Sequence, residues 1–236
     1  MLEAKEITSL LRKQKRDSEL LVAGVPLISG TETSHILLSG SPGTGKSTTL
    51  YDLMKFIRAR GDRAITYSPS GDFIERYFKE GDHVLNPFDA RCKTWNLWSE
   101  CEQQYHFNMI AEAMIPDGNS GDPFWNNAGR TLVSSLLLAM KKQGSESLPE
   151  FLRLLTECEL SELHSYLEGT SAASIIDPEN AKTALSIRTT AATYALALQF
   201  VPDGLEPFNI RRWVTNDSGS DWVARYPYAD RPPSGG

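Results

Sequence analysis

A phosphate-binding loop is the first feature of this sequence that could do chemistry. Residues 40–47 read Gly-Ser-Pro-Gly-Thr-Gly-Lys-Ser and match the pattern Gly-x-x-x-x-Gly-Lys-Ser/Thr at every fixed position. The glycines let the backbone wrap closely around an anion, so that its N–H groups point at the phosphates. The Lys46 ammonium can reach the β- and γ-phosphates, and the Ser47 hydroxyl can ligate Mg²⁺. The expected nucleotide-binding residues are Gly40, Ser41, Pro42, Gly43, Thr44, Gly45, Lys46, Ser47 and Thr48, with Ser47 as the metal ligand.

The flanking residues have the patterns that such a loop requires. Ile36-Leu37-Leu38 predicts a short buried strand that leads into the loop. A helix should begin at Lys46, because four apolar residues follow at positions 50, 53, 54 and 57 and share one face. Gly61 is placed to end this helix. The loop therefore lies at a helix N-terminus, whose partial positive charge favours phosphate.

Alternation of strands and helices continues on both sides of the loop. Residues 1–20 predict an amphipathic helix, and Leu20–Ile28 predicts a bent or edge strand because Gly24 and Pro26 interrupt it. Downstream, a strand at Ala64–Tyr67, a helix around Phe73–Phe78 and a strand at Val84-Leu85 form a βαβ unit. Such a unit predicts a parallel sheet, and hence an α/β fold.

From about Trp95 the sequence becomes helical throughout, which favours an all-α domain inserted into the α/β domain. We expect a nucleotide-binding domain over residues 1–94, the helical domain over 95–205, and a return to the first domain over 206–223. Ala224–Gly236 reads as an atypical tail rich in Pro and Gly, unable to form a central strand. The expected helices are Glu102–Ile115, Ala128–Lys142, Leu148–Glu157, Leu160–Glu168 and Pro178–Phe200, and Glu206–Val214 is a candidate returning strand.

The carboxylate half of an NTPase site should be an apolar strand that ends in Asp or Asp-Glu. Ile175-Ile176-Asp177 is too short for it, Val201-Pro202-Asp203 has proline inside the run, and Ala64–Tyr67 ends in a serine. We therefore expect half of a catalytic site, with the Walker B carboxylates absent from the chain. Nucleotide binding with weak or no hydrolysis is the corresponding expectation.

Composition and charge narrow the class of protein. The 236 residues carry 24 Lys and Arg against 30 Asp and Glu, a formal net charge of −6, with 40% hydrophobic residues. This balance excludes intrinsic disorder and a generally basic nucleic-acid binder. The longest apolar stretches, Leu132–Met140 and Ala191–Val201, are shorter than the roughly 20 residues that a membrane helix needs. Free thiols and a cytoplasmic location are expected, the three cysteines being Cys92, Cys101 and Cys158.

Four further segments, in a fixed order behind the loop, point to a family. They are Ser68-Pro69-Ser70-Gly71-Asp72-Phe73, Leu85-Asn86-Pro87-Phe88-Asp89-Ala90-Arg91, Asp122-Pro123-Phe124-Trp125 and Gly129-Arg130. With the phosphate-binding loop, this set resembles the conjugative type IV coupling proteins of the TraD/TrwB kind. The resemblance extends from about Ile28 to Trp222.

The resemblance implies a RecA-like domain interrupted by an all-α domain. It also implies a homo-hexameric ring at the cytoplasmic face of the bacterial inner membrane. Such rings use ATP and Mg²⁺ to move single-stranded DNA, with its relaxase, toward a type IV secretion channel. By the same resemblance, Gly45, Lys46 and Ser47 contact phosphate and Mg²⁺.

The chain departs from the family pattern at three places. The two N-terminal membrane helices of the family are absent, and Ser68 stands where the family usually has Asp. The family's Asp-Glu strand and arginine finger would follow Trp222, where the proline-rich tail begins. We therefore expect a truncated or frameshifted product. The competing functions are a non-catalytic nucleotide-binding product and a P-loop kinase of another class.

Other candidate residues have a structural interpretation beside the functional one. Asn86 and Asp89 could orient nucleotide or cap a turn, and Arg91 could contact phosphate or form a surface salt bridge. The basic residues Arg130 and Lys141-Lys142 of the helical region could touch DNA phosphates or lie on a solvated helix face. The same alternatives hold for Arg211-Arg212, near a possible strand start. Trp95, Trp98 and Trp125 could stack on DNA bases, although core packing is the usual role of such residues.

Overall fold

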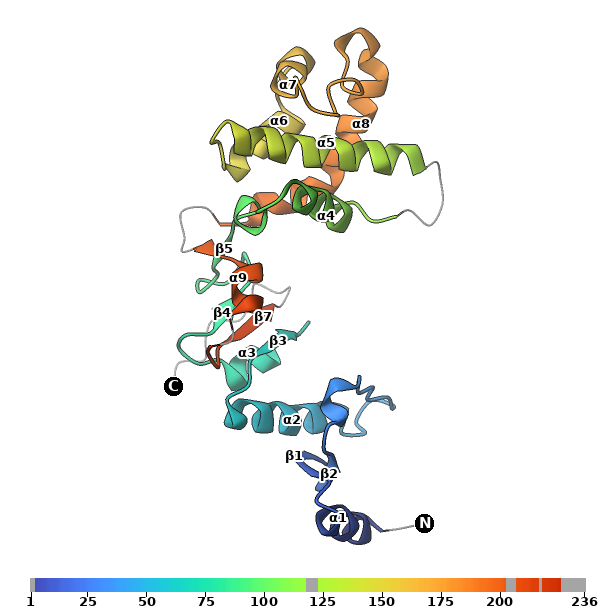
Figure 1. Ribbon diagram of the computed structural model, residues 1–236, viewed down its shortest axis with the longest axis vertical. Coiled ribbons are helices and arrows are strands. Elements are labelled where there is room, and N and C mark those ends of the chain that lie inside the picture. Colours follow the sequence, from blue (N-terminus) through green and yellow to red (C-terminus); the bar gives the residue numbers. More distant parts are fainter. Residues whose placement is uncertain (1–2, 118–122, 203–206, 217, 226–236) are drawn as a thin grey trace. The chain divides into compact units, whose positions relative to one another are not determined.

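The structure is a computed structural model that describes residues 3–117, 123–202, 207–216 and 218–225 (Figure 1). These residues form two compact units. Unit 1 comprises residues 3–86 and 218–225, and unit 2 comprises the described part of Pro87–Asn216. The sequence-based division at residues 94/95 and 205/206 therefore differs from the division between compact units, which falls at 86/87 and 216/217.

Unit 1 begins with a helix and a strand hairpin. Helix α1 spans Ala4–Lys13, and strands β1 (Asp17–Val22) and β2 (Val25–Ile28) pair in antiparallel fashion. The helix is shorter than the predicted 1–20, and the single bent strand predicted at 20–28 is wrong. The chain reverses at Ala23 and Gly24, whose φ angles are 49° and 80°. Two successive positive φ angles make the tight turn that joins hairpin strands.

A three-stranded parallel sheet forms the centre of unit 1. Its order is β3 (Ala64–Tyr67), β7 (Trp222–Arg225) and β4 (His83–Val84), and α3 (Asp72–Tyr77) connects β3 to β4. The predicted parallel sheet is confirmed. The prediction that residues 224–236 lie outside the sheet is wrong for Ala224 and Arg225, because both belong to the central strand. The prolines of the tail start at Pro227, so they do not block pairing at these two residues.

An ion pair fixes the central strand in place. Arg58, in the last turn of helix α2 (Lys46–Arg60), forms a bidentate contact with Asp82, and the two side chains are only 9% and 4% exposed. The Asp82 carboxylate also accepts a hydrogen bond from the backbone N–H of Trp222 at 2.8 Å. The Arg58 guanidinium lies 3.9 Å from the centre of the Trp222 ring. One cluster thus joins the phosphate-loop helix, the β4 end of the sheet and the start of β7.

The strand predicted at Ile36-Leu37-Leu38 is not formed. Residues 35–41 have no regular structure, and Ile36 and Leu37 are 49% and 89% exposed. A strand exists only when it has a partner, and none of the strands in the described part of unit 1 pairs with this segment. The segment has the apolar pattern of a buried strand, but burial depends on a neighbouring strand and not on the pattern.

Unit 2 is helical and packs around α5 (Pro123–Lys142), which contacts α4 (Gln104–Met114) and α8 (Ala181–Ala195). Each of the predicted helices is confirmed to within a few residues. The core of unit 2 combines aliphatic residues of these helices with Trp98 and Phe151. Unit 2 also contains α6 (Leu148–Thr156), α7 (Leu160–Tyr166) and the 3-10 turns η2 (Trp98–Glu100), η3 (Pro178–Asn180) and η4 (Leu196–Phe200). A further 3-10 turn, η1 (Thr31–Thr33), belongs to unit 1.

The segment 206–214, predicted to return to the nucleotide-binding domain as a strand, belongs instead to unit 2 in its described part. Strand β6 (Pro207–Phe208) pairs in parallel with β5 (Thr94–Trp95), and α9 (Ile210–Thr215) follows it. The buried Glu100 explains the helix, because its carboxylate accepts hydrogen bonds from the backbone N–H groups of Ile210 and Arg211 at 2.6 and 2.9 Å. Such contacts satisfy the first N–H groups of a helix and favour its start at this point.

Within the described ranges, the helices are all too short or too polar to cross a membrane.

Candidate nucleotide-binding site

The phosphate-binding loop has the backbone geometry that its glycines predict. Gly43 and Gly45 have φ angles of 78° and 84°, which side-chain-bearing residues rarely adopt. Gly45 immediately precedes α2, so Lys46 is the first helical residue and Ser47 the second. The loop therefore ends where the free N–H groups of the helix are concentrated, and this end is suited to an anion.

Internal contacts hold the loop in a closed turn. The Lys46 ammonium donates to the backbone carbonyl oxygens of Gly40 and Ser41, each at 2.7 Å. The Thr44 hydroxyl donates to the Ser41 carbonyl at 2.8 Å. A Cβ atom at Gly40 would lie only 2.7 Å from the Thr44 hydroxyl, so a larger residue there would displace this hydroxyl from its contact with the Ser41 carbonyl. The Lys46 ammonium thus folds back over the loop, at the position from which it can meet a phosphate.

Ser47 is the metal ligand that the sequence predicts for this site. Its side chain is exposed at the start of α2. Across the described residues, the structure contains no group of three or more His, Cys, Asp or Glu side chains that could hold a metal ion. Ser47 and the phosphate oxygens of a bound nucleotide are the groups that could ligate Mg²⁺ here.

The carboxyl edge of the sheet carries the motif residues that follow β3 and β4. Ser68 is buried, its N–H donates to the Arg225 carbonyl at 3.0 Å, and its hydroxyl lies 3.4 Å from that of Ser70. Gly71 has a φ angle of 75° and precedes α3, so this segment is a tight turn into that helix. Asn86 is also buried. The residues at this edge therefore shape turns, and the Ser68 hydroxyl is occupied within its own turn.

Asp89 and Arg91 pair with each other. The Asp89 carboxylate accepts hydrogen bonds from the backbone N–H of Arg91 at 2.7 Å and from its guanidinium at 2.7 and 2.9 Å. The carboxylate thus closes a short turn of the kind that Asp favours. The structural interpretation of Asp89 and the salt bridge expected for Arg91 are both confirmed.

The three tryptophans have different environments. Trp98 is buried and donates from its indole N–H to the Leu137 carbonyl at 3.0 Å, and Trp95 donates to the Glu100 carboxylate at 3.2 Å. Core packing is therefore confirmed for Trp98. It is wrong for Trp125, which is 37% exposed and forms an edge-to-face pair with the 46% exposed Phe124. Both rings of this aromatic pair, on the first turn of α5, are therefore partly exposed to solvent.

Most of the candidate DNA-contacting cations have structural partners. Arg130 donates to the Ile115 carbonyl at 2.7 Å and pairs with Asp117. Lys141 donates to the carbonyls of Trp98 and Cys101, and Arg211 donates to the Glu100 carbonyl at 3.1 Å. The partners of these cations are mostly backbone carbonyls, whose position in space no local pattern predicts. Lys142 and Arg212 are the other candidates, and the Lys142 side chain is exposed.

Sequence reasoning missed the buried charges that position the functional elements. Arg58 and Asp82 fasten the phosphate-loop helix to the sheet, and Glu100 fastens α9. Glu100 and Ile210 are 110 residues apart, and Asp82 and Trp222 are 140 residues apart. Contacts over such separations leave no local signal. Phe124 could have been found, because it adjoins Trp125 in the motif segment.

Together, the parallel sheet, the phosphate-binding loop and the inserted helices define an α/β P-loop protein with the RecA-like fold. Residues 19–224 match the family described as the type IV secretion-system coupling protein DNA-binding domain. The chain belongs to this family.

Relatives of known name agree with this assignment. The chain is 33% identical over 226 residues to the coupling protein TraD of Escherichia coli (strain K12), covering 93% of this chain and 32% of TraD. The unbound form of the bacterial conjugative coupling protein TrwB (TrwBdeltaN70) has a TM-score of 0.82 and 28% identity, covering 96% of this chain and 53% of that one. TrwB in complex with ADP and Mg²⁺ also has a TM-score of 0.82 at 28% identity, covering 95% and 54%. The chain thus spans about a third of TraD and about half of the TrwB structures.

Proposed function

We propose that this chain binds ATP with Mg²⁺ through residues 40–48 and is the ATP-binding part of a conjugative coupling protein. The observation that carries the proposal is the phosphate-binding loop, in which Gly43 and Gly45 have positive φ angles and Lys46 begins α2. The backbone N–H groups and the Lys46 ammonium would hold the phosphates, and the Ser47 hydroxyl would ligate Mg²⁺. The complex of TrwB with ADP and Mg²⁺ supports this choice of nucleotide and metal.

The proposal extends to the work done by the whole protein. By its family, the protein would hydrolyse ATP at subunit interfaces of a hexameric ring on the cytoplasmic face of the inner membrane. The ring would drive single-stranded DNA, with its relaxase, toward the type IV secretion channel. The exposed Phe124 and Trp125 rings support a contact with DNA, because aromatic side chains stack on unpaired bases of any sequence.

Binding of Mg²⁺-ATP to the full chain, measured by calorimetry, tests the nucleotide site. Lys46→Ala removes charge-assisted hydrogen bonds worth about 1.5–3 kcal/mol, so the affinity should fall roughly 10- to 150-fold. Lys55→Ala is the matched control, because Lys55 is an exposed lysine of the same helix. Equal losses in the two variants, or no loss in Lys46→Ala, would refute the site.

A chain that binds nucleotide without turning it over is the second candidate. It is favoured by the sequence, in which no apolar strand of suitable length ends in the Asp or Asp-Glu that the carboxylate half of the site needs. DNA-stimulated ATP hydrolysis by the same preparation separates the two functions. Turnover that disappears in Lys46→Ala would show that the chain supplies a catalytic carboxylate, whereas binding alone would favour the non-catalytic product.

A further inference from the structure

A buried histidine caps the start of helix α4. The N-cap of this helix is Gln103, and the third helical residue is His106. In the common capping box that third residue is Glu or Gln, whose side-chain oxygen accepts the backbone N–H of the cap residue. Here the Nδ1 atom of His106 accepts the backbone N–H groups of Glu102 and Gln103, at 3.0 and 3.1 Å. His106 is only 3% exposed, so the protein interior surrounds this cap.

These two contacts fix the protonation state of the ring. A backbone N–H can only donate, so Nδ1 of His106 must accept, and the single ring proton of the neutral imidazole is on Nε2. A second proton, on Nδ1, would take up the lone pair that accepts both hydrogen bonds. It would also place three N–H groups against one another. The protonated ring is therefore incompatible with this cap.

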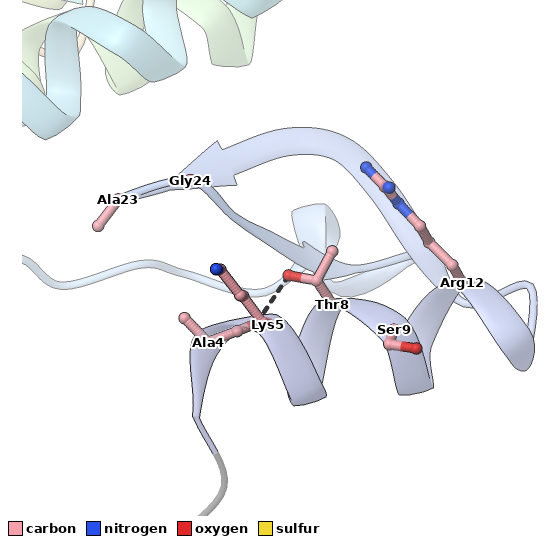
Figure 2. Close-up of a pocket in the computed structure, with 7 residues that line it drawn as sticks. All are labelled: Ala4, Lys5, Thr8, Ser9, Arg12, Ala23 and Gly24. Carbon is pink, nitrogen blue, oxygen red and sulfur yellow. Dashed lines mark hydrogen bonds between the residues drawn. The ribbon is translucent and has the colours of Figure 1, made fainter.

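Helix α1 begins with the same arrangement, but with a carboxylate in place of the imidazole. The Glu6 carboxylate accepts the backbone N–H of Glu3 at 2.8 Å. Figure 2 shows the first turns of this helix, where the Thr8 hydroxyl donates to the Ala4 carbonyl at 2.8 Å. Hydroxyl groups do not titrate near neutral pH, and carboxylates ordinarily stay ionised down to about pH 5. The start of α1 should therefore not respond to mild acid.

The other histidines make contacts that tolerate a second ring proton. Nδ1 of His164 lies 2.7 Å from the carbonyl oxygen of Ile176, so it donates, and this hydrogen bond remains when the ring is charged. Nε2 of His83 lies 3.1 Å from the Asp221 carboxylate, a contact that a charged imidazole strengthens. His35 is exposed. Mild acid therefore opposes the contacts of His106 and leaves those of His164 and His83 in place.

The titratable groups that adjoin the cap do not favour a second proton on the ring. The Tyr105 ring lies edge-on to the imidazole, with 4.2 Å between the ring centres. The Glu100 carboxylate already accepts hydrogen bonds from Trp95 and from the backbone of α9. The other groups are the buried Cys101 thiol, the exposed Glu102, Lys141, which donates to the Cys101 carbonyl, and Arg211, which donates to the Glu100 carbonyl. Two of them are cations, which disfavour a further positive charge.

We propose that His106 is a pH-sensitive cap, which binds the backbone of residues 102–103 while its ring is neutral and releases it when Nδ1 is protonated. These residues connect η2 to α4, so release loosens the connection between the two elements. Since the released form accepts the proton and the capped form does not, the cap stabilises the protein at neutral pH, and this stabilisation is lost as the pH falls. Nucleotide binding plays no part in this inference.

Hydrogen exchange of the full chain, measured by mass spectrometry at about pH 7.5 and about pH 5.5, tests the proposal. The rates are corrected for the intrinsic pH dependence of exchange. An ordinary histidine takes up a proton around pH 6.5, so acid should favour the released form and lower the protection of residues 102–106 by about tenfold between the two pH values. The protection of α1 is the internal reference and should change by less than about twofold.

Two variants identify the group that responds. In His106→Gln, the glutamine can accept the Gln103 N–H as in the common capping box and does not titrate, so the tenfold change should disappear. In His164→Gln, the matched control in the same unit, the tenfold change should remain. The proposal would be overturned by a change that persists in His106→Gln or is lost in His164→Gln, because the acid would then act elsewhere. Unchanged protection in the parent chain would also overturn it.

Nitrogen NMR of the imidazole rings provides a test that needs no variant. At about pH 7.5, the ring proton of His106 should be on Nε2, and that of His164 on Nδ1. A proton on Nδ1 of His106 at this pH would overturn the proposal, because the ring could then not accept the two backbone N–H groups.

Discussion

The buried contact between Arg58 and Asp82 predicts a large loss of stability in unit 1 when one of its partners is removed. The Asp82 carboxylate accepts hydrogen bonds from the guanidinium of Arg58 and, at 2.8 Å each, from the backbone N–H groups of Lys79 and Trp222. Asp82→Ala would leave two N–H groups and a guanidinium buried without their acceptor. Removing one partner of a buried pair costs about 3–5 kcal/mol.

Hydrogen exchange followed by mass spectrometry measures this loss where it occurs. A loss of 3–5 kcal/mol should accelerate exchange of the β7 amides between roughly a hundredfold and several thousandfold. Peptides of α5 in unit 2 provide the internal reference, and Glu80→Ala is the matched control because Glu80 is an exposed carboxylate near Asp82. Removing both partners, as Arg58→Met with Asp82→Leu, should cost less than Asp82→Ala alone, since no buried charge then lacks its partner.

The reasoning would be refuted if exchange in Asp82→Ala stayed within about threefold of the parent chain. It would also be refuted if the double variant lost as much as the sum of its two single variants, because an additive result means that the two side chains do not interact.

Three further predictions concern other parts of the chain. Glu100→Ala should release α9, because the N–H groups of Ile210 and Arg211 lose their acceptor, at a cost of about 1–3 kcal/mol, and exchange of the α9 amides checks it. Ile65 and Tyr67 on the edge strand β3 are 65% and 62% exposed, so the chain should self-associate with rising concentration, and Ile65→Lys should reduce this association in sedimentation experiments. Burial raises the pKa of the Cys101 thiol to about 11 from an ordinary value of 9.0, so at pH 8 a thiol reagent should react far more slowly with the native chain than with the urea-unfolded chain.

Each of these three predictions would be contradicted by a specific result. Unchanged α9 exchange in Glu100→Ala would show that the carboxylate does not hold the helix, and a stable monomer at high concentration would contradict the unpaired edge. For Cys101 the linkage has a definite sign. A raised native pKa means that the unfolded state loses the proton first, so this contribution to stability is complete below about pH 9 and declines as the pH rises further. Stability that increased above pH 9 would contradict the assignment.

The sequence alone determined the features that depend on neighbouring residues. The loop at 40–47, helix α2 behind it and the helices of unit 2 were all predicted, because capping residues and helical periodicity act within a few positions. The turn at Asp89 was recognised for the same reason. The ordered motifs also identified the family, which residues 19–224 match.

Only the tertiary structure decided which strand lies at the centre of the sheet and which segment has no partner. Trp222–Arg225 is central because it pairs with β3 on one side and with β4 on the other. Asp82, 140 residues earlier, accepts the N–H of Trp222, and no local pattern carries these contacts. Ile36-Leu37-Leu38 has the apolar pattern of a strand but pairs with no strand in the part of the chain that the structure describes. Exposure of Trp125 and the structural role of Arg130 were likewise unpredictable. Burial and pairing are properties of what lies alongside a residue, and in this chain the decisive neighbours are often more than a hundred positions away.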